Sequence, residues 1–227
     1  MVEPASFVFT LATWVLPLIV AIVFHEISHG WVANAFGDPT AKRLGRLSPN
    51  PIRHIDPVGT VALPLFLAVV GAPVFGWAKP VPVVARRMRN PRLHMMLVAL
   101  AGPGMNLLLA LFAAFALAGA LALGQPGGFG FGFLVANLEN FLIINIFLAV
   151  FNMLPIPPFD GGHVVEGLLP RPLAGHFAKL SRFGFPLLVL LLVVVPWIWP
   201  QADVVERVVV PPVQALLQFF ASLAGLR

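Results

Sequence analysis

Long stretches without a single charged residue are the feature that most limits what this chain can fold into. Three of them cover residues 4–24, 97–138 and 183–202. Each reaches the ~20 residues that a helix needs to cross the hydrocarbon core of a bilayer. Only 10% of all residues are charged, whereas soluble domains average about 25%. The pattern therefore excludes an ordinary soluble domain and predicts a multi-pass integral membrane protein.

The first apolar stretch is interpreted as a retained span and not as a signal peptide. Glu3 stands where a signal peptide carries basic residues, and no small-residue cleavage site follows the apolar run. The net charge of +5 comes with basic residues that lie in short loops between the apolar stretches. Such loops set membrane orientation, so nucleic acid is not expected as a partner.

The apolar pattern predicts an all-α polytopic bundle of about four to six transmembrane helices. We expect one integral-membrane domain over residues 1–227, with its core at about 5–170 and a C-terminal span and amphipathic helix at about 183–227. The expected helices cover residues 5–36, 93–123, 133–153, 183–199 and 213–226. The last of these is too short to cross a bilayer unaided.

His25-Glu26-Ile27-Ser28-His29 has the pattern HExxH and ends the first predicted span. Residues four apart share one helix face, so both imidazoles can reach one metal ion, with Glu26 placed to take a proton from water. The alternative is a helix end whose polar residues only contact lipid headgroups. A charge at membrane depth costs roughly 2.5–3.5 kcal/mol or more, so a metal site is the favoured interpretation.

Asp160 is the outstanding candidate for a third ligand, because catalytic zinc usually has three protein ligands and the chain contains no cysteine. Three prolines precede Asp160, and Gly161-Gly162 allow the chain to turn tightly behind its carboxylate. Taken alone, however, this pattern favours a proline-rich turn with a solvated aspartate.

Three motifs in this order resemble the site-2 protease family of intramembrane zinc metalloproteases, in a compact form without a PDZ-like or nucleotide-sensing domain. They are HExxH at 25–29, Gly102-Pro103-Gly104-Met105-Asn106, and Asn152 followed by Pro155 and Asp160-Gly161-Gly162. The similarity extends over about residues 22–162.

The resemblance implies a role for each matching residue. His25, His29 and Asp160 are expected to bind one Zn2+ per chain. Glu26 is expected to be the general base, and Asn152 to help bind the substrate carbonyl or its oxyanion. Asn106 is assigned to the substrate-binding region, as a packing and positioning residue.

The reaction implied by the resemblance is hydrolysis of peptide bonds by zinc-activated water. Its substrates would be membrane-spanning or membrane-adjacent proteins, whose helices must unwind locally to expose a peptide bond. The expected location is the cell membrane, with the active site toward the cytoplasm. The competing hypothesis is a non-hydrolytic membrane metal-binding protein, either a transporter or a scaffold. The scarcity of acidic residues argues against an ion pathway.

Residues 58–75 are expected to be re-entrant, with Pro64 and Gly71 interrupting the helix, because both flanks are strongly basic. A full crossing there would place Asp160 and His29 on opposite faces of the membrane, and the metal site could not form.

Residues 76–84 are expected to form a short edge strand near the site. Pro80 and Pro82 are two apart, so their missing N–H groups lie on the same edge. The other edge is expected to bind an unwound substrate as an added strand, through Trp77, Val81 and Val83. A plain proline-rich loop is the equal alternative.

Overall fold

The computed structural model describes residues 4–70, 76–124, 128–199, 201 and 205–226. This part of the chain is predominantly helical, and no strand is assigned within it. Its main helices, in chain order, are α1 (Pro4–Ala35), α2 (Thr40–Arg43), α3 (Leu63–Val70), α4 (Pro91–Ala122), α5 (Phe129–Asn152), α6 (Asp160–Leu168), α7 (Arg171–Leu180), α8 (Gly184–Val189), α9 (Val195–Ile198) and α10 (Val210–Leu223). Shorter turns of 3-10 or π type are η1 (Pro51–His54), η2 (Pro57–Ala62), η3 (Ala85–Arg87), η4 (Ser181–Phe183), η5 (Leu190–Val194) and η7 (Val205–Val209).

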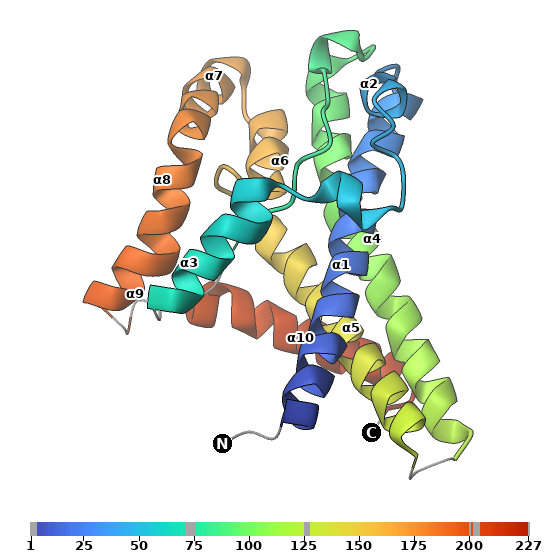
Figure 1. Ribbon diagram of the computed structural model, residues 1–227. Coiled ribbons are helices and arrows are strands. Elements are labelled where there is room, and N and C mark those ends of the chain that lie inside the picture. The colour runs from blue at the N-terminus through green and yellow to red at the C-terminus, as the bar shows by residue number, and fades with distance from the viewer. Residues whose placement is uncertain (1–3, 71–75, 125–127, 200, 202–204, 227) are drawn as a thin grey trace.

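Three of the described helices are long and apolar enough to cross a membrane: α1 over Val8–Ala35, α4 and α5. They pack together as the centre of the molecule, with α4 running against the direction of α1 and α5 (Figure 1). This confirms the predicted all-α membrane class. The larger number of four to six spans stays a prediction.

The C-terminal region is more broken than the sequence pattern suggested. The predicted span at 183–199 consists of α8, the π-helical turn η5 and α9, which follow one another directly. These pieces continue directly from α7 and η4, so helical residues run without a gap from Arg171 to Ile198. A membrane crossing here stays a prediction. The last helix, α10, passes across the bundle (Figure 1) and buries Val213 and Phe220 in the core formed with α4 and α5.

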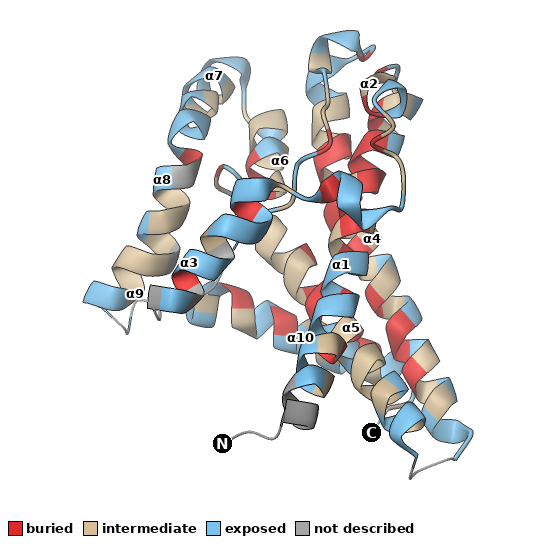
Figure 2. Ribbon diagram, viewed as in Figure 1, coloured by how far each residue is buried: buried red, intermediate tan, exposed pale blue. Residues whose placement is uncertain are grey.

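Buried residues gather where the long helices meet, and exposed residues lie on the outside of the bundle (Figure 2). Many of the exposed residues are large and apolar. On α4, for example, Leu108 is 63% exposed and Phe112 is 64% exposed. Soluble monomers rarely expose such contiguous apolar surface. Hydrocarbon is the solvent in which these faces are stable, which agrees with the spans defined by length and hydropathy.

Small residues line the contacts between the long helices. Ala21 on α1, Ala110 and Ala113 on α4, and Ala149 on α5 are all at most 2% exposed. In a bilayer the hydrophobic effect does not drive helices together, so close backbone approach at small residues supplies the packing energy instead. This close approach brings the polar residues of α1 within hydrogen-bonding distance of α4.

Residues 77–79 lie beside residues 54–59, at the start of η2. The N–H of Trp77 donates to Gly59 O at 3.1 Å, and the N–H of Lys79 donates to His54 O at 2.9 Å. Pro64 is the second residue of α3, which follows the π-helical turn η2 without a gap, so the helix changes type next to this proline. The predicted interruption at Pro64 stays a prediction. Gly71 lies outside the described residues. Residues 76–84 have no helix or strand assignment, so the edge strand is not confirmed.

Asp38, just beyond the end of α1, fixes the far end of this segment. Its carboxylate accepts hydrogen bonds from the N–H and hydroxyl of Thr40 and from the N–H of Val84, the last at 2.5 Å. Nη1 of Arg87 lies 3.8 Å from Oδ1 of Asp38. Burial alone would raise the pKa of Asp38, but these hydrogen bonds and the Arg87 charge outweigh it, so the pKa lies below its ordinary value.

We expect Asp38→Asn to destabilise the protein by about 1–3 kcal/mol, because one acceptor oxygen becomes a donor that faces an N–H group. Because the native pKa of Asp38 is lowered, its stabilisation is present above the unfolded pKa of about 3.9 and is lost as the pH falls through the native value. The difference in stability between wild type and Asp38→Asn should therefore shrink as the pH falls toward and below the pKa of Asp38. Thermal unfolding of both proteins in detergent, from neutral to acidic pH, measures this difference. Asp56→Asn, at the exposed start of η2, is the control with a smaller expected loss.

Candidate metal centre

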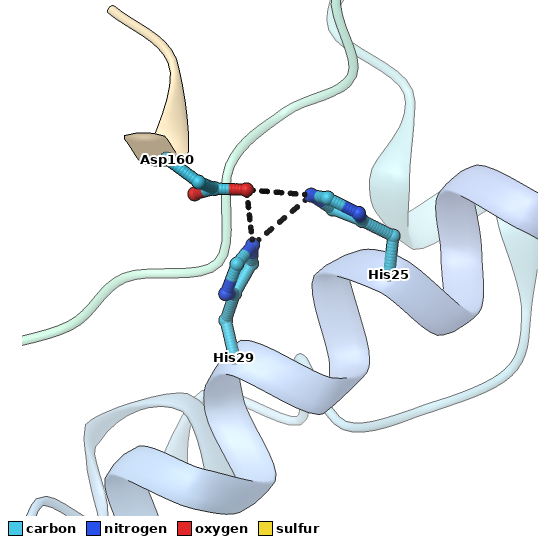
Figure 3. Close-up of side chains that lie close together, drawn as sticks. All are labelled: His25, His29 and Asp160. Carbon is cyan, nitrogen blue, oxygen red and sulfur yellow. Dashed lines mark hydrogen bonds and ion pairs between the residues drawn. The ribbon is translucent and has the colours of Figure 1, made fainter. Parts of the chain in front are cut away.

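His25 and His29 lie one turn apart on α1 and face Asp160 at the start of α6 (Figure 3). The two Nε2 atoms are 3.1 Å apart. Asp160 Oδ2 lies 3.2 Å from Nε2 of His25 and 3.5 Å from Nε2 of His29. Two segments more than 130 residues apart in sequence thus converge on one point, as a metal site requires.

The other ring nitrogen of each histidine is bound to an oxygen acceptor. His25 Nδ1 lies 2.6 Å from Asn106 Oδ1, and His29 Nδ1 lies 2.7 Å from the carbonyl of Val98. Each Nδ1 therefore carries the proton in the neutral ring, and each Nε2 directs a lone pair toward Asp160. Asp160 Oδ2 is itself buried and accepts no hydrogen bond from the described residues.

Three electron-pair donors that crowd together repel one another unless a cation lies between them. The donor set suits zinc, which binds imidazole nitrogen and carboxylate oxygen at about 2.0–2.2 Å with tetrahedral geometry. For bonds of that length the edge of a tetrahedron is about 3.3 Å, and the three observed separations of 3.1, 3.2 and 3.5 Å bracket it. These residues therefore fit a zinc ion.

Gly102 on α4 forms one wall of the site. A Cβ atom at this position would lie 2.5 Å from Cε1 of His25 and 2.5 Å from Cε1 of His29. Any side chain here would displace both rings, so the glycine of the Gly-Pro-x-x-Asn element is needed for close approach of the α4 backbone. Contact of Gly102 with the two imidazoles was not predicted from the sequence.

Gly161 has a similar role on the Asp160 side. A Cβ atom there would lie 2.4 Å from the carbonyl oxygens of Met153 and Leu154, at the end of α5. The predicted reason for Gly161 was a tight turn behind the carboxylate. The structure instead places it inside the first turn of α6, where close packing against the backbone requires glycine.

Glu26 is held by the backbone of the 76–84 segment. Its Oε2 accepts a hydrogen bond from the N–H of Val81 at 2.8 Å. The carboxylate is partly buried and lies one residue along α1 from His25. A single hydrogen bond leaves lone pairs on both carboxylate oxygens, so the group remains able to take a proton.

Asn106 and Asn152, the two predicted asparagines, lie in different surroundings. Asn106 is fully buried and its Oδ1 lies 2.6 Å from Nδ1 of His25, which agrees with a packing and positioning residue. Its assignment to the substrate-binding region stays a prediction. Asn152 lies at the end of α5, partly exposed, and its Nδ2 donates to Leu148 O at 2.9 Å. Its predicted contact with the substrate oxyanion stays a prediction.

The three residues of the predicted docking edge are engaged within the chain. The N–H groups of Trp77 and Val81 donate to Gly59 O and to Glu26 respectively. The side chain of Val81 is buried, and that of Val83 packs with Val98 of α4. Docking of a substrate strand on this edge stays a prediction, and it would require exchange of these hydrogen bonds.

The fold and the site together define a class of protein. It is a helical membrane bundle in which two histidines of an HExxH motif converge with one aspartate. The sequence profile of Peptidase family M50 matches residues 13–132 and 129–192. The chain therefore belongs to this family, the site-2 protease family.

Named relatives support the same assignment. YwhC of Bacillus subtilis, a candidate zinc metalloprotease by name, is 39% identical over 83% of this chain and 85% of its own length. Rip2 of Mycolicibacterium smegmatis, named in the same way, is 28% identical over 82% of this chain and 67% of its own length. Rip2 of Mycobacterium tuberculosis is 31% identical over 82% of this chain and 66% of its own length. No solved structure matches. The family and these names support a zinc metalloprotease.

Gly102→Ala should weaken zinc binding by about 10–100-fold, the loss expected when the support of a ligating histidine is disturbed. Gly104→Ala, two residues away on the same helix, is the matched control, because its Cβ would have no atom within 4 Å. Competition with a chromogenic chelator measures both affinities. Equal zinc affinities in the two variants would contradict the inference that a side chain at position 102 displaces the rings of His25 and His29.

Proposed function

We propose that this protein is an intramembrane zinc metalloprotease that hydrolyses peptide bonds of membrane-spanning or membrane-adjacent protein substrates. The observation that carries the proposal is the convergence of His25, His29 and Asp160, with Glu26 beside them, inside a bundle whose outer surface is apolar. Membership of Peptidase family M50 supports the reaction class.

His25, His29 and Asp160 would hold the zinc ion. Zinc in such a site supplies a Lewis acid that acidifies water and polarises a carbonyl group. Glu26 accepts the proton of the attacking water at its carboxylate and later delivers it to the leaving amine. In the resting arrangement the N–H of Val81 holds this carboxylate at 2.8 Å, so the base has a defined position before substrate arrives.

Asn152 is proposed to steady the oxyanion. It lies at the C-terminal end of α5, a short loop before Asp160, and an amide N–H donor there is the group that a developing negative charge requires. Its Nδ2 donates one hydrogen to Leu148 O, and the second hydrogen of the NH2 group is the one proposed to meet the oxyanion.

The proposed membrane orientation follows from the basic residues. The end of α1, the start of α4 and the helix α7 lie at one end of the bundle (Figure 1), and the basic loops adjoin them. The positive-inside rule assigns that end to the cytoplasm. The paired flanks at 54–59 and 77–79 support a re-entrant course for the intervening residues.

Reporter fusions test this topology. We expect reporters placed after Arg53 and after Arg87 to give the same cytoplasmic signal, because the hydrogen bonds from Lys79 to His54 and from Trp77 to Gly59 keep both flanks together. Protease accessibility of tags at the same positions is an independent measurement. Signals from opposite faces of the membrane would refute the re-entrant course.

Metal content with three matched proteins tests the function itself. Wild type should contain one zinc per chain, Asp160→Ala should lose it, and Glu26→Gln should keep it. Glu26→Gln should also lose proteolysis of membrane substrates by at least about 100-fold, the lower end of the range for an acid–base group. The Gln side chain can still accept from Val81, so the geometry of the 76–84 segment is preserved.

The same proteins distinguish a transporter or a scaffold from a protease. Full function in Glu26→Gln with zinc retained would contradict the protease and favour a non-hydrolytic role. Absence of zinc from wild type prepared without chelators would refute the proposed reaction, because no metal would be present to activate water.

A further inference from the structure

Asn145 is a fully buried polar residue at the contact between α5 and α4, and the mechanism above gives it no role. An amide buried in a membrane bundle is costly unless each of its polar atoms is bonded. Asn145 meets this requirement with two contacts. Its Nδ2 donates to Phe141 O at 2.8 Å, and its Oδ1 accepts from Nδ2 of Asn106 at 2.8 Å.

These contacts determine which way each amide points. Phe141 O can only accept, so Nδ2 of Asn145 must face it and Oδ1 must face Asn106. Asn106 must then present its Nδ2 to Asn145, and the same group reaches Ala21 O at 3.3 Å. Both hydrogens of that NH2 group are thereby used.

The orientation of Asn106 in turn fixes His25. With Nδ2 committed to Asn145, only Oδ1 of Asn106 can face the imidazole, and it lies 2.6 Å from Nδ1. An oxygen acceptor at that position requires the proton on Nδ1, which leaves the Nε2 lone pair directed at the metal position. Reversal of the Asn106 amide would place a donor against Nδ1 and favour the wrong tautomer.

We propose that Asn145 is a positioning residue of the metal centre, which sets the tautomer and direction of His25 through Asn106. The inference rests on the zinc site of the proposed function. It extends the support of the metal ligands to a third helix, α5, which also leads into the loop before Asp160. Loss of the hydrogen-bonding support of a ligating histidine weakens metal binding by about 10–100-fold.

The test compares zinc affinity in Asn145→Leu and Asn137→Leu. Asn137 also donates from Nδ2 to the carbonyl four residues earlier, Phe133 O, at 2.8 Å, but it is not bonded to Asn106. We expect Asn145→Leu to raise the zinc dissociation constant by about 10–100-fold and Asn137→Leu to leave it unchanged. Asn145→Asp, protonated at this buried position, can donate its O–H to Phe141 O and keep its carbonyl oxygen toward Asn106. It should therefore bind zinc much as wild type does, which also tests the proposal if Asn145→Leu fails to fold.

A double-mutant cycle identifies the route. If Asn145 acts through Asn106, then Asn145→Leu should weaken zinc binding no further in an Asn106→Ala background. Additive losses, wild-type affinity in Asn145→Leu, or loss of zinc in Asn145→Asp would each overturn the proposal. A wild-type protein without zinc would instead refute the proposed function, so the two failures are distinguishable.

Discussion

A polar atom buried in a bilayer has no water to bind, so it must find its partner within the protein. In this chain that constraint extends from the backbone to the side chains of the site. Asn145 on α5 binds Asn106 on α4, and Asn106 binds His25 on α1. The three long helices are therefore held in register by the same bonds that orient a metal ligand. Stability of the bundle and preparation of the site cannot be separated here.

Close backbone approach makes these bonds possible. Alanines at the helix contacts and Gly102 beside the imidazoles let α4 lie against α1 without intervening side chains. The wall of the site is thus the backbone of a helix, which is stiffer than a layer of side chains. Since a zinc site needs its ligands placed to within a few tenths of an ångström, a rigid wall supplies accuracy that flexible side chains would not.

The sequence was sufficient to predict which three residues converge at the site, because each carries a local signal. HExxH places His25 and His29 on one face of a helix, and the resemblance of the Asn152–Gly162 motif identified Asp160. The supporting partners of these residues carry no such signal. His29 is held by the carbonyl of Val98, which any residue type could provide. Asn145 carries no such signal either, since a single asparagine in a span does not reveal which partner it meets.

The long spans at α1, α4 and α5 were predicted to within a few residues from charge-free length. The region of residues 57–84 was harder to predict, because its course depends on contacts between separate backbone segments. The partner of Glu26 is the N–H of Val81, a group present in every residue except proline. Side-chain patterns contain no information about such bonds.

Trp77 and Val81 direct their N–H groups into the protein, and the residues that alternate with them include Pro80 and Pro82. At those two prolines the outward edge can offer only carbonyl oxygens. Any backbone segment that hydrogen-bonds to the chain at these two positions must therefore supply the N–H group itself.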